Sequence, residues 1–178
     1  MSRAFPTVAA IVAAAIAVAA ASTLQAQLAP AKVSRFGLAA SVDAGVNPTS
    51  RLHAVVGPTI HATYGGWGAL ALGYKGTGAK YTSTLLGGAL SRRVLQLNAL
   101  SGTMFVGYGT YSETGWSGIE RSSPGWIAGG MGALDFGRLS LRVSYSDFRG
   151  RYDGKDVVAP FSYNAPRVTI GLAIHAIR

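Results

Sequence analysis

The residues best suited to acid–base chemistry in this chain are three histidines, His53, His61 and His175. A metal or catalytic role would require acids at matching positions, but Asp43 and Asp135 form no ligand-spaced motif such as H-E-x-x-H with them. Imidazole groups are readily satisfied by hydrogen bonds in a polar interior. The pattern therefore favours hydrogen-bonding histidines, and neither a catalytic residue, a metal nor a cofactor is expected.

The composition argues against a soluble helical protein. Charged residues make up only 13% of the chain, glycine occurs 24 times and cysteine is absent. Soluble domains usually carry about 25% charged residues, so this balance is typical of strands in lipid. The formal net charge of +9 could indicate a nucleic-acid partner. For an exported chain we expect no nucleic acid, and membrane lipids and lipopolysaccharide as the anionic partners.

The first segment is typical of an export signal. It carries one positive charge at Arg3, then an apolar run from Val8 to Ala21, then a small-residue stretch that ends at Ala26. We expect residues 1–26 to be a cleaved signal peptide and residues 27–178 to form a single domain. An uncleaved helical anchor is the alternative, but the apolar run is shorter than the about 20 residues that a spanning helix needs.

Beyond that segment, apolar residues recur at every second position. The clearest strands are 139–146 and 166–178, where bulky aliphatic residues alternate with Ser, Thr, Gly and Arg. Further strands are predicted near 35–46, 52–64, 69–75, 80–97, 103–109 and 126–136. In the third, the apolar face is assigned to Leu70, Leu72 and Tyr74. The fourth does not alternate cleanly, and a β-bulge would repair its phase.

The connections between these strands alternate in length. Gly65-Gly66, 98–102 and Gly137-Arg138 are short, whereas 47–51, 76–80, 112–124 and 150–165 are longer. Four longer links in alternation with short turns predict eight antiparallel strands with both ends of the sheet on the short-turn side. This is the plan of a transmembrane β-barrel, with 112–124 and 150–165 displayed as extracellular loops.

The two faces of the strands have different expected surroundings. An eight-stranded barrel has an interior just wide enough for side chains, so the small and polar face is expected inside. The interior polar network is predicted to comprise Arg35, Asp43, His53, His61, Lys75, Arg92, Asp135, Arg142, Arg167 and His175. Aromatic belts at the membrane interfaces are predicted from Phe36, Tyr64, Phe136, Tyr74, Tyr81, Tyr108, Trp126 and Tyr145.

With this pattern, the chain resembles the small eight-stranded outer-membrane barrels of the OmpA and OmpX type over residues 32–178. The resemblance implies location in the bacterial outer membrane and insertion by the barrel-assembly machinery. Family members commonly finish on an aromatic residue that this machinery recognises. Here the outward row of the last strand ends in Ala176 and Arg178 instead.

The leading interpretation is a non-enzymatic envelope protein with a side-chain-filled interior, displaying loops for surface interaction or envelope integrity, its extracellular ligand unknown. Cations on the turn side, among them Arg93, Arg138 and Arg178, are also candidates to hold inner-leaflet phosphates. Two alternatives come from other classes. A lipid A-modifying barrel enzyme would need a histidine that faces lipid, and a soluble lipocalin-like barrel would turn the apolar row inward.

Overall fold

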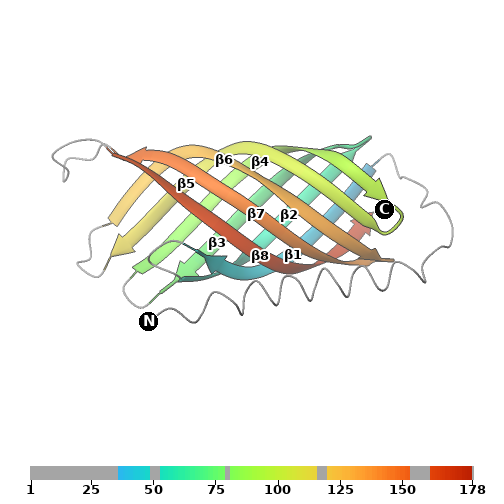
Figure 1. Ribbon diagram of the computed structural model, residues 1–178, viewed down its shortest axis with the longest axis horizontal. Coiled ribbons are helices and arrows are strands. Elements are labelled where there is room, and N and C mark those ends of the chain that lie inside the picture. Colours follow the sequence, from blue (N-terminus) through green and yellow to red (C-terminus); the bar gives the residue numbers. More distant parts are fainter. Residues whose placement is uncertain (1–35, 49–52, 79–80, 116–119, 153–160, 178) are drawn as a thin grey trace.

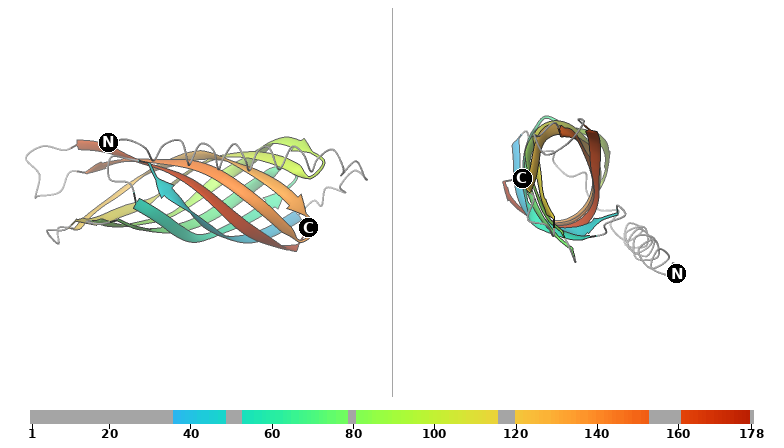
Figure 2. Two further views of the ribbon diagram at one scale, coloured as in Figure 1. Left: turned by 60° about the horizontal axis from the view of Figure 1, so that its bottom comes forward. Right: turned by 90° about the vertical axis from the view of Figure 1, so that its left-hand side faces the viewer.

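The structure is a computed structural model that describes residues 36–48, 53–78, 81–115, 120–152 and 161–177. Each strand pairs antiparallel with the next, and the first also pairs with the last, which closes a barrel. Figure 1 shows the strands inclined to the long axis, and the end-on view of Figure 2 shows one continuous wall. The eight strands are β1 (Phe36–Asn47), β2 (His53–Tyr64), β3 (Trp67–Thr77), β4 (Tyr81–Leu97), β5 (Leu100–Gly115), β6 (Glu120–Phe136), β7 (Leu139–Tyr152) and β8 (Phe161–Ile177).

The predicted eight-stranded up-and-down barrel is confirmed. Tight turns join β2 to β3, β4 to β5 and β6 to β7 at one end, which we call the turn end. Backbone with positive φ allows these reversals at Gly65 (56°), Gly66 (92°), Asn98 (48°) and Gly137 (71°). The first residue of β1 pairs beside the β2–β3 turn, so both ends of the sheet lie here, as expected. The opposite end is the loop end.

Alternation separates an apolar outer wall from an inner wall. Val42, Leu90 and Leu172 expose 65%, 67% and 65% of their surface on the outer wall. Their strand neighbours Asp43 and Ser91 are only 5% and 2% exposed because they point into the barrel. Among the described residues there is no helix with the length and apolarity needed to cross a bilayer.

The predicted phase of β3 is wrong. Leu70, Leu72 and Tyr74 are buried inside the barrel, at 5%, 6% and 7% exposure, whereas Trp67 and Lys75 lie on the outer wall. Between Trp67 and Lys75, Leu and Tyr form the inner face of this strand and Ala and Gly form its outer face, so neither polarity nor bulk reveals which face meets lipid. The interior needs the bulky set because it has space to fill.

The fourth strand contains the predicted irregularity at a later position than its sequence suggests. Leu85 points inward and Leu86 points outward, as regular alternation requires. In the same way, Arg93 points inward and Arg92 points outward. The register with β5 shifts only between Arg93 and Leu95. The two neighbouring pairs of large residues therefore belong to a regularly alternating strand that carries large side chains on both walls. The bulge near the turn end interrupts this in-and-out alternation.

The predicted extracellular loops are shorter than expected. Strands β5 and β6 occupy most of 112–124, and β7 and β8 occupy both ends of 150–165. These strand extensions pair in continuous register, from Thr114 with Glu120 and from Tyr152 with Phe161. The remaining loop residues and the predicted signal segment 1–26 lie outside the described residues.

A cluster of large side chains, the apolar plug, fills the barrel from its middle toward the loop end. Leu85, Ile127 and Phe148 are fully buried in it. Inner-wall glycines make room: a Cβ at Gly125 or Gly150 would lie 2.7 Å from the Phe148 ring. The interior is thus largely apolar here, which corrects the expectation of a small and ionic lumen. Its members are Leu70, Leu72, Tyr74, Leu85, Ala89, Phe105, Tyr111, Ile127, Met131, Phe148 and Ala165.

Candidate functional site

Three strands are joined by a buried carboxylate on the inner wall. Thr59 Oγ1 donates a hydrogen bond to Asp43 Oδ2 at 2.6 Å, and the Tyr74 hydroxyl donates to the same oxygen at 3.0 Å. The two hydroxyls are themselves 3.1 Å apart. Hydrogen bonds to an ionised acceptor are shorter and stronger than neutral ones. Asp43 therefore ties β1, β2 and β3 together inside the barrel.

Two arginines are buried in the same interior but differ in their contacts. Arg167 is 2% exposed, donates to the carbonyl oxygen of Ala165 at 3.2 Å and lies 5.3 Å from the centre of the Tyr111 ring. Arg142 is 4% exposed, and its one hydrogen bond to a described residue is a 3.5 Å contact from Nη1 to Ser41 Oγ. Its Nε has no acceptor among the described residues. Of the two arginines, Arg142 therefore has the weaker set of contacts with the described residues.

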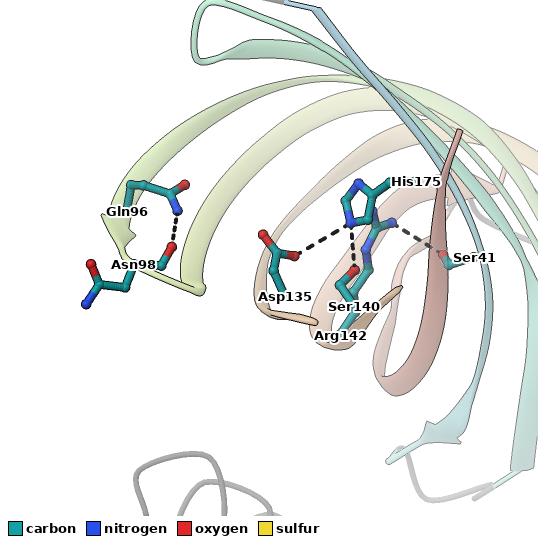
Figure 3. A network of polar contacts seen from close by, with 7 residues as sticks. All are labelled: Ser41, Gln96, Asn98, Asp135, Ser140, Arg142 and His175. Carbon is teal, nitrogen blue, oxygen red and sulfur yellow. Dashed lines mark hydrogen bonds and ion pairs between the residues drawn. The ribbon is translucent and has the colours of Figure 1, made fainter. Parts of the chain in front are cut away.

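A cavity of about 110 Å³ opens beside Arg142 toward the turn end. We call it the turn-end chamber and define it by its chemically active lining, His61, Arg93, Asp135, Ser140, Arg142 and His175. Figure 3 shows Asp135, Ser140 and His175 directed toward one another, with Arg142 beside them. His61 Nε2 lies 2.9 Å from Ser91 Oγ on the opposite side. The chamber thus gathers charged and polar groups from five strands, β2, β4, β6, β7 and β8.

The chamber contains a serine, a histidine and an acid, but not in a catalytic arrangement. His175 Nε2 is 3.2 Å from Ser140 Oγ and 3.6 Å from Asp135 Oδ1. A nucleophilic triad needs the acid on one ring nitrogen and the hydroxyl on the other, whereas both of these contacts use Nε2. Among the described residues no group of three His, Cys, Asp or Glu gathers as a metal site. The arrangement suits hydrogen bonding rather than nucleophilic attack.

The structure places most of the predicted interior residues on the inner wall. These are Asp43, His61, Asp135, Arg142, Arg167 and His175. Two predictions are corrected: Lys75 and Arg92 lie on the outer wall, because the phases of β3 and β4 differ from those assigned. Arg92 instead stacks over Trp67, 4.6 Å from the ring centre. Arg35 and the side chain of His53 lie outside the described part of the chain.

The aromatic residues of the outer wall lie mainly at its two ends. Phe36, Tyr64 and Phe136 are exposed at the turn end, and Tyr108 and Trp126 are exposed in the loop half. Tyr108 and Trp126 meet edge to face, 5.5 Å apart. Tyr145 is also exposed, at the middle of β7.

Two aromatic predictions are corrected and one aromatic residue was missed. Tyr74 points inward to Asp43, and Tyr81 shares the inward phase of Ser83. Trp67, 56% exposed at the turn end, belongs to the outer wall but was not predicted there. Its position follows from the same corrected phase of β3.

Comparison with solved structures supports this architecture. Neisserial surface protein A matches with a TM-score of 0.57 and 9% sequence identity, over 79% of this chain and 97% of that one. A designed transmembrane β-barrel matches with a TM-score of 0.43 and 18% identity, over 79% of this chain and 95% of that one. The second likeness is too distant to carry weight. The sequence matches no protein-family model and no curated protein.

At this level of identity, the likeness to Neisserial surface protein A concerns the fold alone. The matched region spans nearly all of the other protein, so the likeness extends over the whole closed barrel described above. Membership of the OmpA and OmpX type remains a prediction from the sequence pattern. What this barrel does must be argued from its own walls and interior.

Proposed function

We propose that this chain is a non-enzymatic protein of the bacterial outer membrane, exported with removal of residues 1–26, whose single barrel supports surface interaction or envelope integrity. The observation that carries the proposal is the outer wall, where Val42, Leu90 and Leu172 expose bulky apolar side chains around a closed sheet. Only closure allows every strand amide in hydrocarbon to find a partner. A soluble lipocalin-like barrel would carry this row inside, so the exposed wall speaks against that alternative.

The filled interior supports a structural role over transport. Leu85, Ile127 and Phe148 are fully buried in the apolar plug, and the space around Tyr74 and Arg142 is only about 10 Å³. An eight-stranded barrel has little spare lumen to begin with. The enzymatic alternative requires a histidine facing lipid, whereas the two histidines whose side chains the structure describes, His61 and His175, both turn into the barrel. These positions support a non-enzymatic function.

Heat-modifiable gel mobility tests the proposal directly. We expect the membrane-extracted protein to migrate as a compact species in dodecyl sulfate until it is heated, because a closed barrel resists unfolding at room temperature. It should also stay in the membrane fraction after washing with high salt or urea. Release into the soluble fraction by either wash would contradict the proposed location.

A charge on the outer wall should be costly in proportion to its depth. Ile170 lies between Ala44 and Val143 on the outer wall, midway between the two aromatic ends. We expect Ile170→Arg to lower the free energy of unfolding in lipid vesicles by about 2–4 kcal/mol. Asn164 is on the same wall of β8 but nearer the loop end, where it pairs with Arg149, which in turn pairs with Trp126. Asn164→Arg should lower the free energy of unfolding by only about 0–1 kcal/mol. Equal costs at both depths would contradict a bilayer around this wall.

Outer-leaflet lipids are the partners that the loop half of the outer wall fits best. A groove of about 610 Å³ there is lined by Tyr108, Trp126, Arg149 and Arg151. The Arg149 side chain is 77% exposed, and its Nε contacts Asp147 at 2.9 Å. Arginines beside interfacial aromatics suit the phosphates and acyl chains of lipopolysaccharide. We also propose the barrel-assembly machinery as the partner that inserts the closed sheet.

Removal of either groove arginine should weaken this association. Arg149→Gln or Arg151→Gln is expected to reduce binding of lipopolysaccharide to the detergent-solubilised barrel about fivefold, because one cation near an anionic surface contributes about 1 kcal/mol. Arg121→Gln is the matched control, since Arg121 lies outside this groove, 5.7 Å from the centre of the Tyr152 ring. An effect of Arg121→Gln as large as that of Arg149→Gln would show that general charge, and not the groove, holds the lipid.

A further inference from the structure

Arg142, which lines the turn-end chamber, donates fewer hydrogen bonds to the described residues than its guanidinium can make. Arg142 is 4% exposed, yet Nε lacks an acceptor among the described residues and Nη1 makes only a 3.5 Å contact. A buried charge is costly unless it is paired and hydrogen-bonded. Arg142 therefore borders the chamber with a guanidinium whose hydrogen-bonding capacity is only partly used by the described residues.

Two acids, Asp43 and Asp135, lie near Arg142 but accept no hydrogen bond from it. Asp43 accepts hydrogen bonds from Thr59 and Tyr74 on one oxygen, and Asp135 lies 3.6 Å from His175 Nε2. Among the described residues, the side chains of Arg93 and Arg142 form no ion pair with a carboxylate. Two guanidiniums thus line the chamber without a direct carboxylate partner among the described residues, while Asp135 contacts His175.

The remaining lining supplies groups that suit an anion. His61 Nε2 and His175 Nε2 bond to Ser91 and Ser140, and both imidazoles line the chamber. Arginine forks match the oxygens of phosphate and sulfate in two parallel hydrogen bonds. Water occupies about 30 Å³ per molecule in the liquid, so about 110 Å³ holds a few waters or one tetrahedral oxyanion.

We propose that the turn-end chamber binds a free inorganic oxyanion of the phosphate or sulfate class, held by Arg93 and Arg142. The ion is a free one because the chamber lies inside the barrel wall, whereas acyl chains contact the outer wall. Arg142 supplies the buried end of the site, and Arg93, half-buried, supplies its mouth. This site goes beyond the proposed function, since a barrel that bound no anion could still serve in the envelope.

Neighbouring arginines provide a matched test. Arg93 lines the chamber, whereas Arg92 lies on the outer wall over Trp67. Titration calorimetry of inorganic phosphate into the folded protein, in a non-ionic detergent at low salt, should show saturable binding. Arg93→Gln is expected to weaken it about ten- to a hundredfold through loss of charge-assisted hydrogen bonds. Arg92→Gln removes the same charge and should leave binding within about twofold.

A second measurement distinguishes loss of phosphate binding from loss of folding. Bound phosphate stabilises only the folded barrel. At one phosphate concentration it should therefore raise the temperature at which the compact gel species is lost in wild type and Arg92→Gln, and raise it much less in Arg93→Gln. Absence of saturable phosphate binding by the compact wild-type barrel would overturn the proposal and indicate that water alone solvates Arg142. Equal losses in Arg92→Gln and Arg93→Gln would overturn it in favour of general counter-ion attraction.

A short-chain phosphatidic acid distinguishes a headgroup from a free ion. The chamber should not prefer it to inorganic phosphate, since its acyl chains have no path through the barrel wall. Tighter binding of this lipid, with sensitivity to Arg92→Gln, would overturn the interior site and place the anion on the outer wall. None of these results would alter the heat-modifiable mobility that tests the envelope function itself.

Discussion

Replacement of Gly129 by valine is expected to leave little folded barrel. Gly129 lies on the inner wall of β6, where a Cβ would fall on the carbonyl oxygen of Tyr145, 2.6 Å from Phe105 Cζ and 2.9 Å from Ser146 Cα. The first and last of these atoms are backbone of the adjacent strand and cannot rotate away. Overpacking a filled core costs about 1–3 kcal/mol and occasionally more, and a clash with backbone belongs to the upper end of this range.

Gly132→Val is the control for this prediction. Gly132 is in the same strand but on the outer wall, and a Cβ there would meet nothing within 4 Å. We expect the compact, heat-modifiable species to be lost in Gly129→Val and retained in Gly132→Val, as measured on gels after refolding into detergent. Retention of the compact species in both variants would show that β6 and β7 do not approach each other as closely as the structure has them.

The strands most clearly predicted from sequence are those in which one wall is polar. In β7 and β8, Leu141 and Leu172 alternate with Arg142 and Thr169, and only one orientation keeps Arg142 out of hydrocarbon. The register, the closure and the turn end then follow from the alternation of short and long links. These parts of the fold depend on local pattern, which a single sequence carries.

The phase of β3 was predicted wrongly although the chain contains the signal that fixes it. Residues that face each other across an antiparallel pair lie on the same wall, and the turn at Gly65 and Gly66 pairs Tyr64 directly with Trp67. Because Tyr64 is on the outer wall, Trp67 and every second residue to Lys75 must be there too. The bulk of Leu70 instead suggests an outward position. This suggestion is wrong because the apolar plug inside the barrel also requires large residues.

The turn-end chamber could not be predicted from the sequence as a site. It depends on which residues face each other across the barrel, and His61 of β2 and Arg142 of β7 are on strands that do not pair. The bulge after Arg93 sets the end of β4 independently of alternation. Predicting that Arg142 points inward was possible, but the absence of an ion pair between it and a described carboxylate depends on the positions of Asp43 and Asp135 in space.

Removal of the Asp43 carboxylate should destabilise the barrel strongly without touching its outer wall. Asp43→Ala deletes the acceptor that Thr59 and Tyr74 share and leaves Arg142 in an interior with one acid fewer. Hydrogen bonds to charged groups contribute about 1.5–3 kcal/mol each, and the two hydroxyls can recover part of this by bonding to each other. We expect a loss of about 3 kcal/mol, measured by urea unfolding in lipid vesicles.

Two milder variants distinguish the loss of hydrogen bonds to the Asp43 carboxylate from the loss of its volume. Asp43→Asn keeps an acceptor oxygen and should lose less than Asp43→Ala, while Tyr74→Phe removes one donor and should lose about 1 kcal/mol. Because the residues touch, the double variant Asp43→Ala with Tyr74→Phe should lose less than the sum of the single variants. Strict additivity, or an Asp43→Ala barrel as stable as wild type, would show that β1 and β3 are not held together through this carboxylate. The outer-wall pair Arg92 and Trp67 would then be the next contact to test between β3 and its neighbours.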